Sequence, residues 1–229
     1  MTESTQSNAS KSPKNGSVKV LLTGFNPFGG ELKNASWEVC KAVAKANLPA
    51  NTMLHLLQVP TVFSEAIGVV TAAIDTLKPD IIICCGQAGG RFAMSVERVA
   101  INIDDASITD NAGVQPLDVA VNAIAPAAYF STLPIKAIVA AMQRDGIPAE
   151  VSNSAGTFVC NHLMFGVLHH LASRKIRAYA GFIHLPYLVE QVIDKADKPS
   201  LSKALMVKGI NSAIKATIIE ISTLTGSST

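Results

Sequence analysis

The sequence lacks the features that mark several common classes of protein. The 19 lysines and arginines exceed the 17 acidic residues by only two, which gives a net charge of +2 over 229 residues. The basic residues form no stripe, so we expect no nucleic-acid partner. No apolar run reaches the roughly 20 residues that span a bilayer, so we expect no membrane partner. Residues 1–17, MTESTQSNASKSPKNGS, are polar and lack the apolar centre of a signal peptide. These absences predict a cytoplasmic protein that begins with a mobile polar tail.

The sequence also lacks the spacing of a metal or cofactor site. Its four cysteines, Cys40, Cys84, Cys85 and Cys160, contain no Cys-x-x-Cys pair and have no zinc-like spacing to the histidines. The glycine-rich segment GQAGG lacks the Lys-Ser/Thr ending of a P-loop. In an intracellular protein we also expect free thiols rather than disulfides. We therefore expect neither a metal nor a cofactor.

Apolar residues are plentiful, at 48%, and their pattern alternates between strands and helices. Short apolar runs that end in turn residues predict strands over residues 18–24, 52–60, 80–90, 149–156 and 177–186. Helical periodicity predicts helices over residues 36–47, 61–77, 134–146, 158–175 and 201–223. Gly146 is expected to end one of these helices, and Ser200 to cap the last. This order predicts a single-domain, three-layer α/β/α sandwich with a largely parallel central sheet, spanning residues 18–225.

Residues 101–129 do not fit this alternation of strands and helices. The segment INIDDASITDNAGVQPLD alternates apolar and polar residues and contains a turn at Asn111–Gly113, so it predicts a hairpin-like excursion. Long irregular segments in compact domains are often functional, which makes this excursion a candidate part of the site.

Cys160 is the first candidate for chemistry. It lies in SNSAGTFVCNHLMFG, after small flexible residues and at the start of an apolar helical run. A helix N-terminus carries about half a positive charge, which favours a thiolate. Free amides in the first helical turn can also bind an oxyanion. The position therefore predicts a nucleophile, which needs a base, usually a histidine oriented by an acid or amide.

Two histidines are candidates for that base. His162 is two residues from Cys160, so on a helix it should point to another side. His184 follows the buried run AGFI, and active sites in open α/β sheets form at the carboxyl ends of strands. We expect Cys160 and His184 to meet at that edge. The alternative, a hydrogen-bonded histidine in the core, stays open.

Glu97 is the candidate acid, and two phenylalanines are candidates for a pocket. Glu97 follows the glycine-rich loop in a nearly apolar segment, where a buried carboxylate needs a histidine or arginine partner. An exposed glutamate beside Arg98 is the alternative. Phe25 and Phe28 follow the first strand in TGFNPFGG and could line a small flat apolar pocket or plug the edge of the core.

Three segments together resemble the pyroglutamyl peptidase type I family of cysteine peptidases. They are TGFNPFGG, GQAGGRFAMSVERVAIN and SNSAGTFVCNH…GFIHLP, and the resemblance runs from about Val18 to Pro186. Each motif is modest by itself, whereas the set in this order is specific. The resemblance implies an α/β/α sandwich and a Cys–His–Glu triad, which falls on Cys160, His184 and Glu97.

The resemblance also implies the remaining site residues and the substrate. Substrate-binding positions fall on Phe25, Phe28, Gln87, Phe158 and Val159, with Asn34 as a weaker match. For the proposed mechanism we also expect the second oxyanion donor in the GQAGGR loop, at Arg91. Met94 departs from the branched aliphatic residues that are usual there. Implied partners are peptides with an N-terminal pyroglutamate and further copies of the chain, as a dimer or tetramer. No cofactor is implied.

The implied substrate suits the residues present. A pyroglutamyl ring is an uncharged lactam, so its site needs no acid or metal to hold an amine. Buried hydrogen bonds to the lactam would discriminate against proline, which lacks the lactam oxygen. Two rivals stay open: another thiol enzyme, such as an amidase or acyl transferase, and a non-catalytic binding protein that has no need of all three triad residues.

Overall fold

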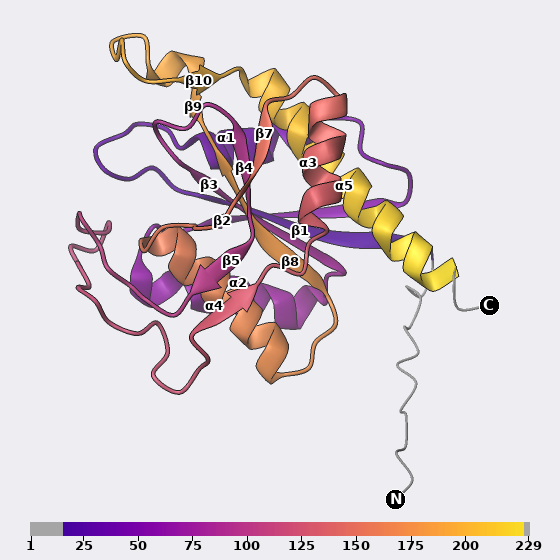
Figure 1. Ribbon diagram of the computed structural model, residues 1–229, viewed down its shortest axis with the longest axis horizontal. Helices are drawn as coiled ribbons and strands as arrows, with labels where there is room; N and C mark the ends of the chain where they lie inside the picture. Colours follow the sequence, from indigo (N-terminus) through magenta and orange to yellow (C-terminus); the bar gives the residue numbers. More distant parts are fainter. Residues whose placement is uncertain (1–15, 227–229) are drawn as a thin grey trace, which may run out of the picture.

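A six-stranded sheet forms the centre of the computed structural model, which describes residues 16–226 and side chains through residue 223 (Figure 1). In spatial order its strands are β2 (Thr52–Val59), β1 (Val18–Phe25), β3 (Ile81–Gln87), β8 (Tyr179–Leu185), β4 (Met94–Glu97) and β7 (Ala149–Ser152). The first four run parallel. β4 pairs antiparallel with β8 and parallel with β7, so the last two strands run in the opposite direction. The predicted, largely parallel sheet is confirmed, with this reversal added.

Helices cover both faces of the sheet, which confirms the three-layer sandwich (Figure 1). On one face lie α1 (Ala35–Val43), α3 (Ile135–Arg144) and α5 (Lys203–Gly226). On the other lie α2 (Phe63–Leu77) and α4 (Val159–Ser173). Every residue of β3 is buried, because alternate side chains enter the two apolar clusters on either side. The continuous apolar run of this strand is the sequence signal of that double burial.

The excursion, residues 101–129, forms an irregular hairpin outside the sheet. Its ends lie in β5 (Val99–Ile101) and β6 (Ala128–Phe130), which pair antiparallel. A single bridge joins Asp104 to Val119, and the Asp110 carboxylate accepts hydrogen bonds from the amides of the predicted turn. The excursion packs beside α4, where it can reach the start of that helix.

Three smaller elements follow β8. They are β9 (Tyr187–Leu188), η1 (Val189–Gln191) and β10 (Ser200–Leu201). Ser200 was expected to cap the last helix, and this is wrong because it pairs with Tyr187 in a short parallel ladder. Ser202 caps α5 instead: its Oγ accepts the Leu205 amide at 3.3 Å. Of the predicted tail, residues 1–15 lie outside the described residues.

Candidate active site

Cys160 is the second residue of α4, and its thiol lies against β3. A Cβ atom added to Gly86 would lie 2.8 Å from the Cys160 Sγ and 2.7 Å from the ring of Phe182. The thiol therefore lies over Gly86, in the space that a side chain at this position would need. Gly86 aligns with His184 on the adjacent parallel strand β8, and adjacent strands are about 4.8 Å apart. The thiol and the imidazole therefore occupy neighbouring positions on the same face of the sheet.

The reason given above for this proximity is partly wrong. We expected Cys160 and His184 to follow the carboxyl ends of parallel strands, but β7, which precedes Cys160, runs opposite to β8. His184 is the second-last residue of β8 and lies at the carboxyl end of that strand, as expected. Residues 153–158 bring the chain from the end of β7 to the start of α4, and this connection places the thiol over Gly86.

His184 and Glu97 form a buried pair. The His184 Nδ1 and the Glu97 Oε1 are 2.7 Å apart, and the two residues are 4% and 0% exposed. The antiparallel register pairs His184 with Ser95, so Glu97, two residues along β4, points to the same face. The alternative of an exposed Glu97 is wrong, and His184 is a buried histidine with a carboxylate partner.

Arg91 completes the surroundings of Glu97. Its guanidinium Nη1 donates to the Glu97 Oε1 at 2.8 Å, and its Nη2 donates to the Ser154 carbonyl at 3.3 Å. The Arg91 amide is directed to the Ala88 carbonyl within the glycine-rich turn, at 3.4 Å. These contacts argue against Arg91 as an oxyanion donor, because its guanidinium pairs with the Glu97 carboxylate instead.

The electrostatics favour a neutral thiol beside a neutral imidazole. Burial, together with the Glu97 carboxylate, raises the pKa of Cys160 to about 12, which opposes the thiolate expected from the helix N-terminus. Burial lowers the pKa of His184, and the nearby Arg91 charge adds to this effect against the pull of Glu97. Burial opposes ionisation of Glu97, but its contacts with His184 and Arg91 outweigh that cost and hold its pKa below the ordinary value. His184 is thus an unprotonated base with an ionised carboxylate behind it.

Aromatic rings gather next to the thiol. Phe158, immediately before α4, lies 5.9 Å from the Phe28 ring and 5.4 Å from the Phe63 ring, measured between centroids. Phe25 is buried and packs against Phe182 at 6.3 Å, on the same face as Cys160. Val159 is fully buried in the core, so only its backbone can face a substrate. Sequence reasoning missed Phe63, because it reads as an ordinary core residue of an amphipathic helix.

Asn34 and Gln87 are engaged within the protein. The Asn34 Oδ1 caps α1 by accepting the Ser36 amide at 3.0 Å, and its Nδ2 donates to the Asn26 carbonyl. The Gln87 Oε1 accepts the Ala35 amide at 2.8 Å, on the face of the sheet opposite to Gly86. Both side chains hold the loop between β1 and α1. Direct contact of either with a substrate stays a prediction.

His162 does not compete for the role of base. Its Nδ1 lies 2.7 Å from the Asp104 Oδ2, in the excursion. Asn161 beside it is fully buried and bonds to the backbone of Ile101 and Ile103. Sequence reasoning missed Asp104 and Asn161, because nothing in the local pattern shows that the excursion folds onto α4.

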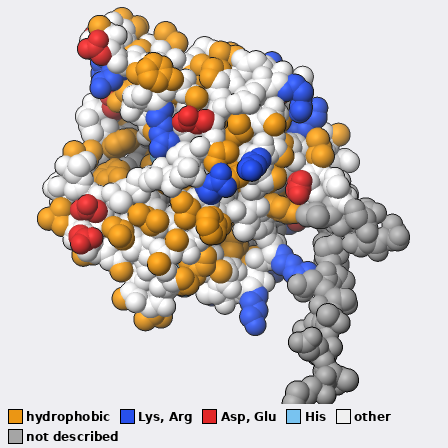
Figure 2. Space-filling model, in the orientation of Figure 1, with side chains coloured by type: hydrophobic (Ala, Val, Ile, Leu, Met, Phe, Trp, Pro, Cys, Tyr) orange, Lys and Arg blue, Asp and Glu red, His pale blue; other side chains and the backbone are white. Residues whose placement is uncertain are grey.

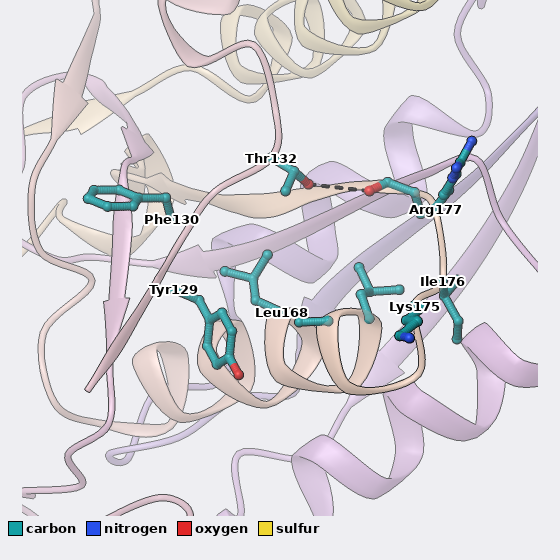
Figure 3. Close-up of a pocket in the computed structure, with 10 residues that line it drawn as sticks. Tyr129, Phe130, Thr132, Leu168, Lys175, Ile176 and Arg177 are labelled. Atoms are coloured by element: carbon teal, nitrogen blue, oxygen red, sulfur yellow. Dashed lines mark hydrogen bonds between the residues drawn. The ribbon is translucent and has the colours of Figure 1, made fainter. Parts of the chain in front are cut away.

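Two of the cavities in the structure are lined by residues other than the triad. One, of about 320 Å³, is lined by Tyr129, Phe130, Leu168 and residues 175–178 (Figure 3). Another, of about 540 Å³, lies between residues 29–33 and 190–195. Within the described residues, no group of three or more His, Cys, Asp or Glu side chains could hold a metal ion, and no helix is long and apolar enough to cross a membrane.

Comparison with known proteins gives one consistent result. The family model for pyroglutamyl peptidase matches residues 18–220. The chain is 50% identical over 199 residues to a pyrrolidone-carboxylate peptidase of Brevibacillus brevis, covering 87% of this chain and 92% of that protein. It is also 50% identical over 201 residues to pyrrolidone-carboxylate peptidase 1 of Caldanaerobacter subterraneus, covering 88% and 98%.

Solved structures agree with the sequences. The crystal structure of pyroglutamyl peptidase I from Bacillus amyloliquefaciens superimposes with a TM-score of 0.83 at 46% identity, covering 87% of this chain and 96% of that one. The pyrrolidone carboxyl peptidase of Thermococcus litoralis superimposes with a TM-score of 0.86 at 37% identity, covering 90% and 96%.

Proposed function

The chain belongs to the pyroglutamyl peptidase family, and we propose that Cys160, His184 and Glu97 carry out the family's reaction in this protein. It is a cysteine peptidase that hydrolyses the bond after an N-terminal pyroglutamyl residue. The observation that carries the residue assignment is the placement of the Cys160 thiol over Gly86, beside the buried His184–Glu97 pair.

The first half of the reaction forms a thioester. His184 takes the thiol proton of Cys160 as the sulfur attacks the pyroglutamyl carbonyl carbon, so the charge that burial disfavours at rest appears only during attack. The carboxylate of Glu97 holds the Nδ1–H of His184 and stabilises the imidazolium. That proton then passes to the leaving amine as the carbon–nitrogen bond breaks.

The second half regenerates the thiol. Water enters in place of the amine, His184 removes a proton from it, and the resulting attack on the thioester releases pyroglutamate. The sulfur then recovers its proton from His184. The amides in the first turn of α4, including that of Cys160, have no acceptor within the helix and are the donors for the oxyanion in both halves.

The aromatic rings provide a slot for the lactam ring. Phe28 and Phe158 are only half-buried, so their faces are accessible next to the nucleophile. Phe25 closes the slot from the core side. An uncharged lactam fits such a slot without a counter-ion, and unpaired polar groups would penalise a prolyl substrate.

The experiment is hydrolysis of a chromogenic pyroglutamyl amide by reduced protein, with the prolyl amide alongside. We expect cleavage of the pyroglutamyl compound alone, and loss of turnover in Cys160→Ala with the melting temperature retained. Cys40→Ala is the matched control, because that thiol is buried on the opposite face of the sheet. Normal turnover by Cys160→Ala would refute the assignment, and preference for other acyl amides would favour a different thiol enzyme.

We also propose a cytoplasmic homo-oligomer, a dimer or tetramer. All four cysteines are free, which is consistent with a reducing compartment. The excursion exposes the apolar side chains of Leu117 and Ile124, at 66% and 94%, and Phe130, the residue after it, is 70% exposed. Figure 2 shows hydrophobic side chains over its lower left, where Figure 1 places the excursion. Sedimentation equilibrium tests the state: Ile124→Lys should shift an oligomer toward monomer, and a monomeric wild-type protein would refute it.

A further inference from the structure

The residues on both sides of Cys160 are bonded to the base of the excursion. Before the cysteine, the Thr157 hydroxyl donates to the Asp105 carbonyl at 2.7 Å, and the Asp105 amide donates back to the Thr157 carbonyl at 3.0 Å. After it, the Asn161 side chain accepts the Ile101 amide and donates to the carbonyls of Ile101 and Ile103, at 2.9 to 3.0 Å. Cys160 thus lies in the middle of a segment, Thr157 to Asn161, that hydrogen bonds to the excursion hold at both ends.

The strongest link in this set is the pair of His162 and Asp104. Their Nδ1 and Oδ2 atoms are 2.7 Å apart, and both residues are buried, at 8% and 5% exposure. The Phe63 ring lies edge-on to the imidazole at 5.3 Å, which restricts its rotation. Asp104 is itself fixed by backbone bonds in both directions to Val119. A buried, charge-assisted hydrogen bond between two fixed groups determines the rotation of the first turn of α4.

We propose that His162 and Asp104 are positioning residues for the nucleophile, which makes the base of the excursion part of the catalytic apparatus. The proposal rests on the proposed role of Cys160. The thiol sits close to the sheet, because a Cβ atom added to Gly86 would lie only 2.8 Å from its Sγ. A small rotation of the first turn of α4 moves Sγ off this position and away from the strand that carries His184.

The test measures kcat and KM separately with a chromogenic pyroglutamyl amide. Asp104→Ala should lower kcat by about 10- to 100-fold, because misplacement of a reacting atom by about 1 Å has effects of that size. KM should change by less than about 3-fold, since the substituted side chain is not itself part of the aromatic slot. His162→Asn, whose Nδ2 replaces the Nδ1 donor to Asp104, should retain most of the wild-type kcat. Asp105→Ala is the matched control, because its bonds to Thr157 are made by the backbone.

The outcomes separate this proposal from the proposed function. If Asp104→Ala keeps kcat while Cys160→Ala is inactive, the pair has only a structural role and the proposal fails alone. A rise in KM with unchanged kcat would also overturn it, because the excursion would then serve substrate binding. If Cys160→Ala stays active, the proposed function itself fails. Should Asp104→Ala not fold, Asp104→Asn decides by the same criteria, with an expected loss in kcat of about 3- to 10-fold because a neutral acceptor holds His162 more weakly.

Discussion

Replacement of Gly86 by alanine should damage catalysis more than any other single methyl group added to this face of the sheet. The new Cβ would lie 2.8 Å from the Cys160 Sγ and 2.7 Å from the Phe182 ring, whereas ordinary contact begins at 3.4 Å. The thiol must therefore retreat by about 0.6 Å (3.4 − 2.8) and the ring by about 0.7 Å (3.4 − 2.7). Because the centroids of the Phe182 and His184 rings are 4.8 Å apart, movement of the Phe182 ring should also disturb the imidazole, the proposed partner of the thiol in proton transfer.

The expected result is a fall in kcat of about 10- to 100-fold, since displacements near 1 Å cost about that much. Overpacking should also lower the free energy of unfolding by about 1–3 kcal/mol. The assay combines hydrolysis of the chromogenic amide with urea unfolding. Gly68→Ala is the matched control: nothing lies within 4 Å of its added Cβ, and alanine in helix α2 should stabilise by about 1 kcal/mol. A folded Gly86→Ala protein with kcat within about 2-fold of wild type would show that the thiol does not lie against Gly86.

Three further predictions concern charge and local stability. Arg91→Gln should raise the pKa of His184 by removing a nearby cation, so the acid limb of the pH profile of kcat/KM should move to higher pH. Arg91→Lys keeps the cation and should leave the acid limb in place. An unshifted acid limb in Arg91→Gln would contradict the contact of Arg91 with Glu97. Because burial raises the pKa of Cys160 to about 12, alkylation by iodoacetamide should rise about tenfold per pH unit between about pH 7 and 10; a plateau in that range would indicate a thiolate at rest. Asn34→Ala should lower the free energy of unfolding by about 1 kcal/mol through loss of the α1 cap, whereas Lys41→Ala on the same helix should cost less than about 0.5 kcal/mol in urea unfolding.

The layers of the fold could be predicted from the sequence because each depends on a local pattern. The run IIICC in β3 contains no polar residue, and a strand can bury every residue of such a run only when both faces of the sheet are covered. Each of the five helices has its own apolar face or turn signal, such as Gly146 at φ +79° just after α3. Errors occurred at the helix ends: the helix predicted to reach residue 47 ends at Val43, and Ser202 rather than Ser200 caps α5.

The direction of β4 and β7 could not be predicted. β4 has four residues and β7 has four, too few to show a period, and strand direction depends on pairing rather than on composition. The burial of Glu97 could not be predicted either, since the same residues around it also fit an exposed strand with alternating apolar and polar positions. The sequence shows only the helix N-terminus, which favours a thiolate at Cys160, whereas the burial and the Glu97 carboxylate that raise its pKa depend on tertiary structure.

The reversal of β4 explains how four separate elements meet at one point. Because β4 lies beyond β8 in the sheet and enters from its carboxyl edge, the glycine-rich loop after β3 must pass over that edge to begin it. Arg91 lies in this crossing, so its long side chain can follow the strand back to Glu97. The strand then places Glu97 level with Phe182, one diagonal step from His184. A parallel β4 would end at the carboxyl edge and leave Glu97 beyond Leu185, out of reach of the imidazole. The reversed strand thus supplies the acid, while the loop that the reversal requires supplies the cation that keeps the acid ionised.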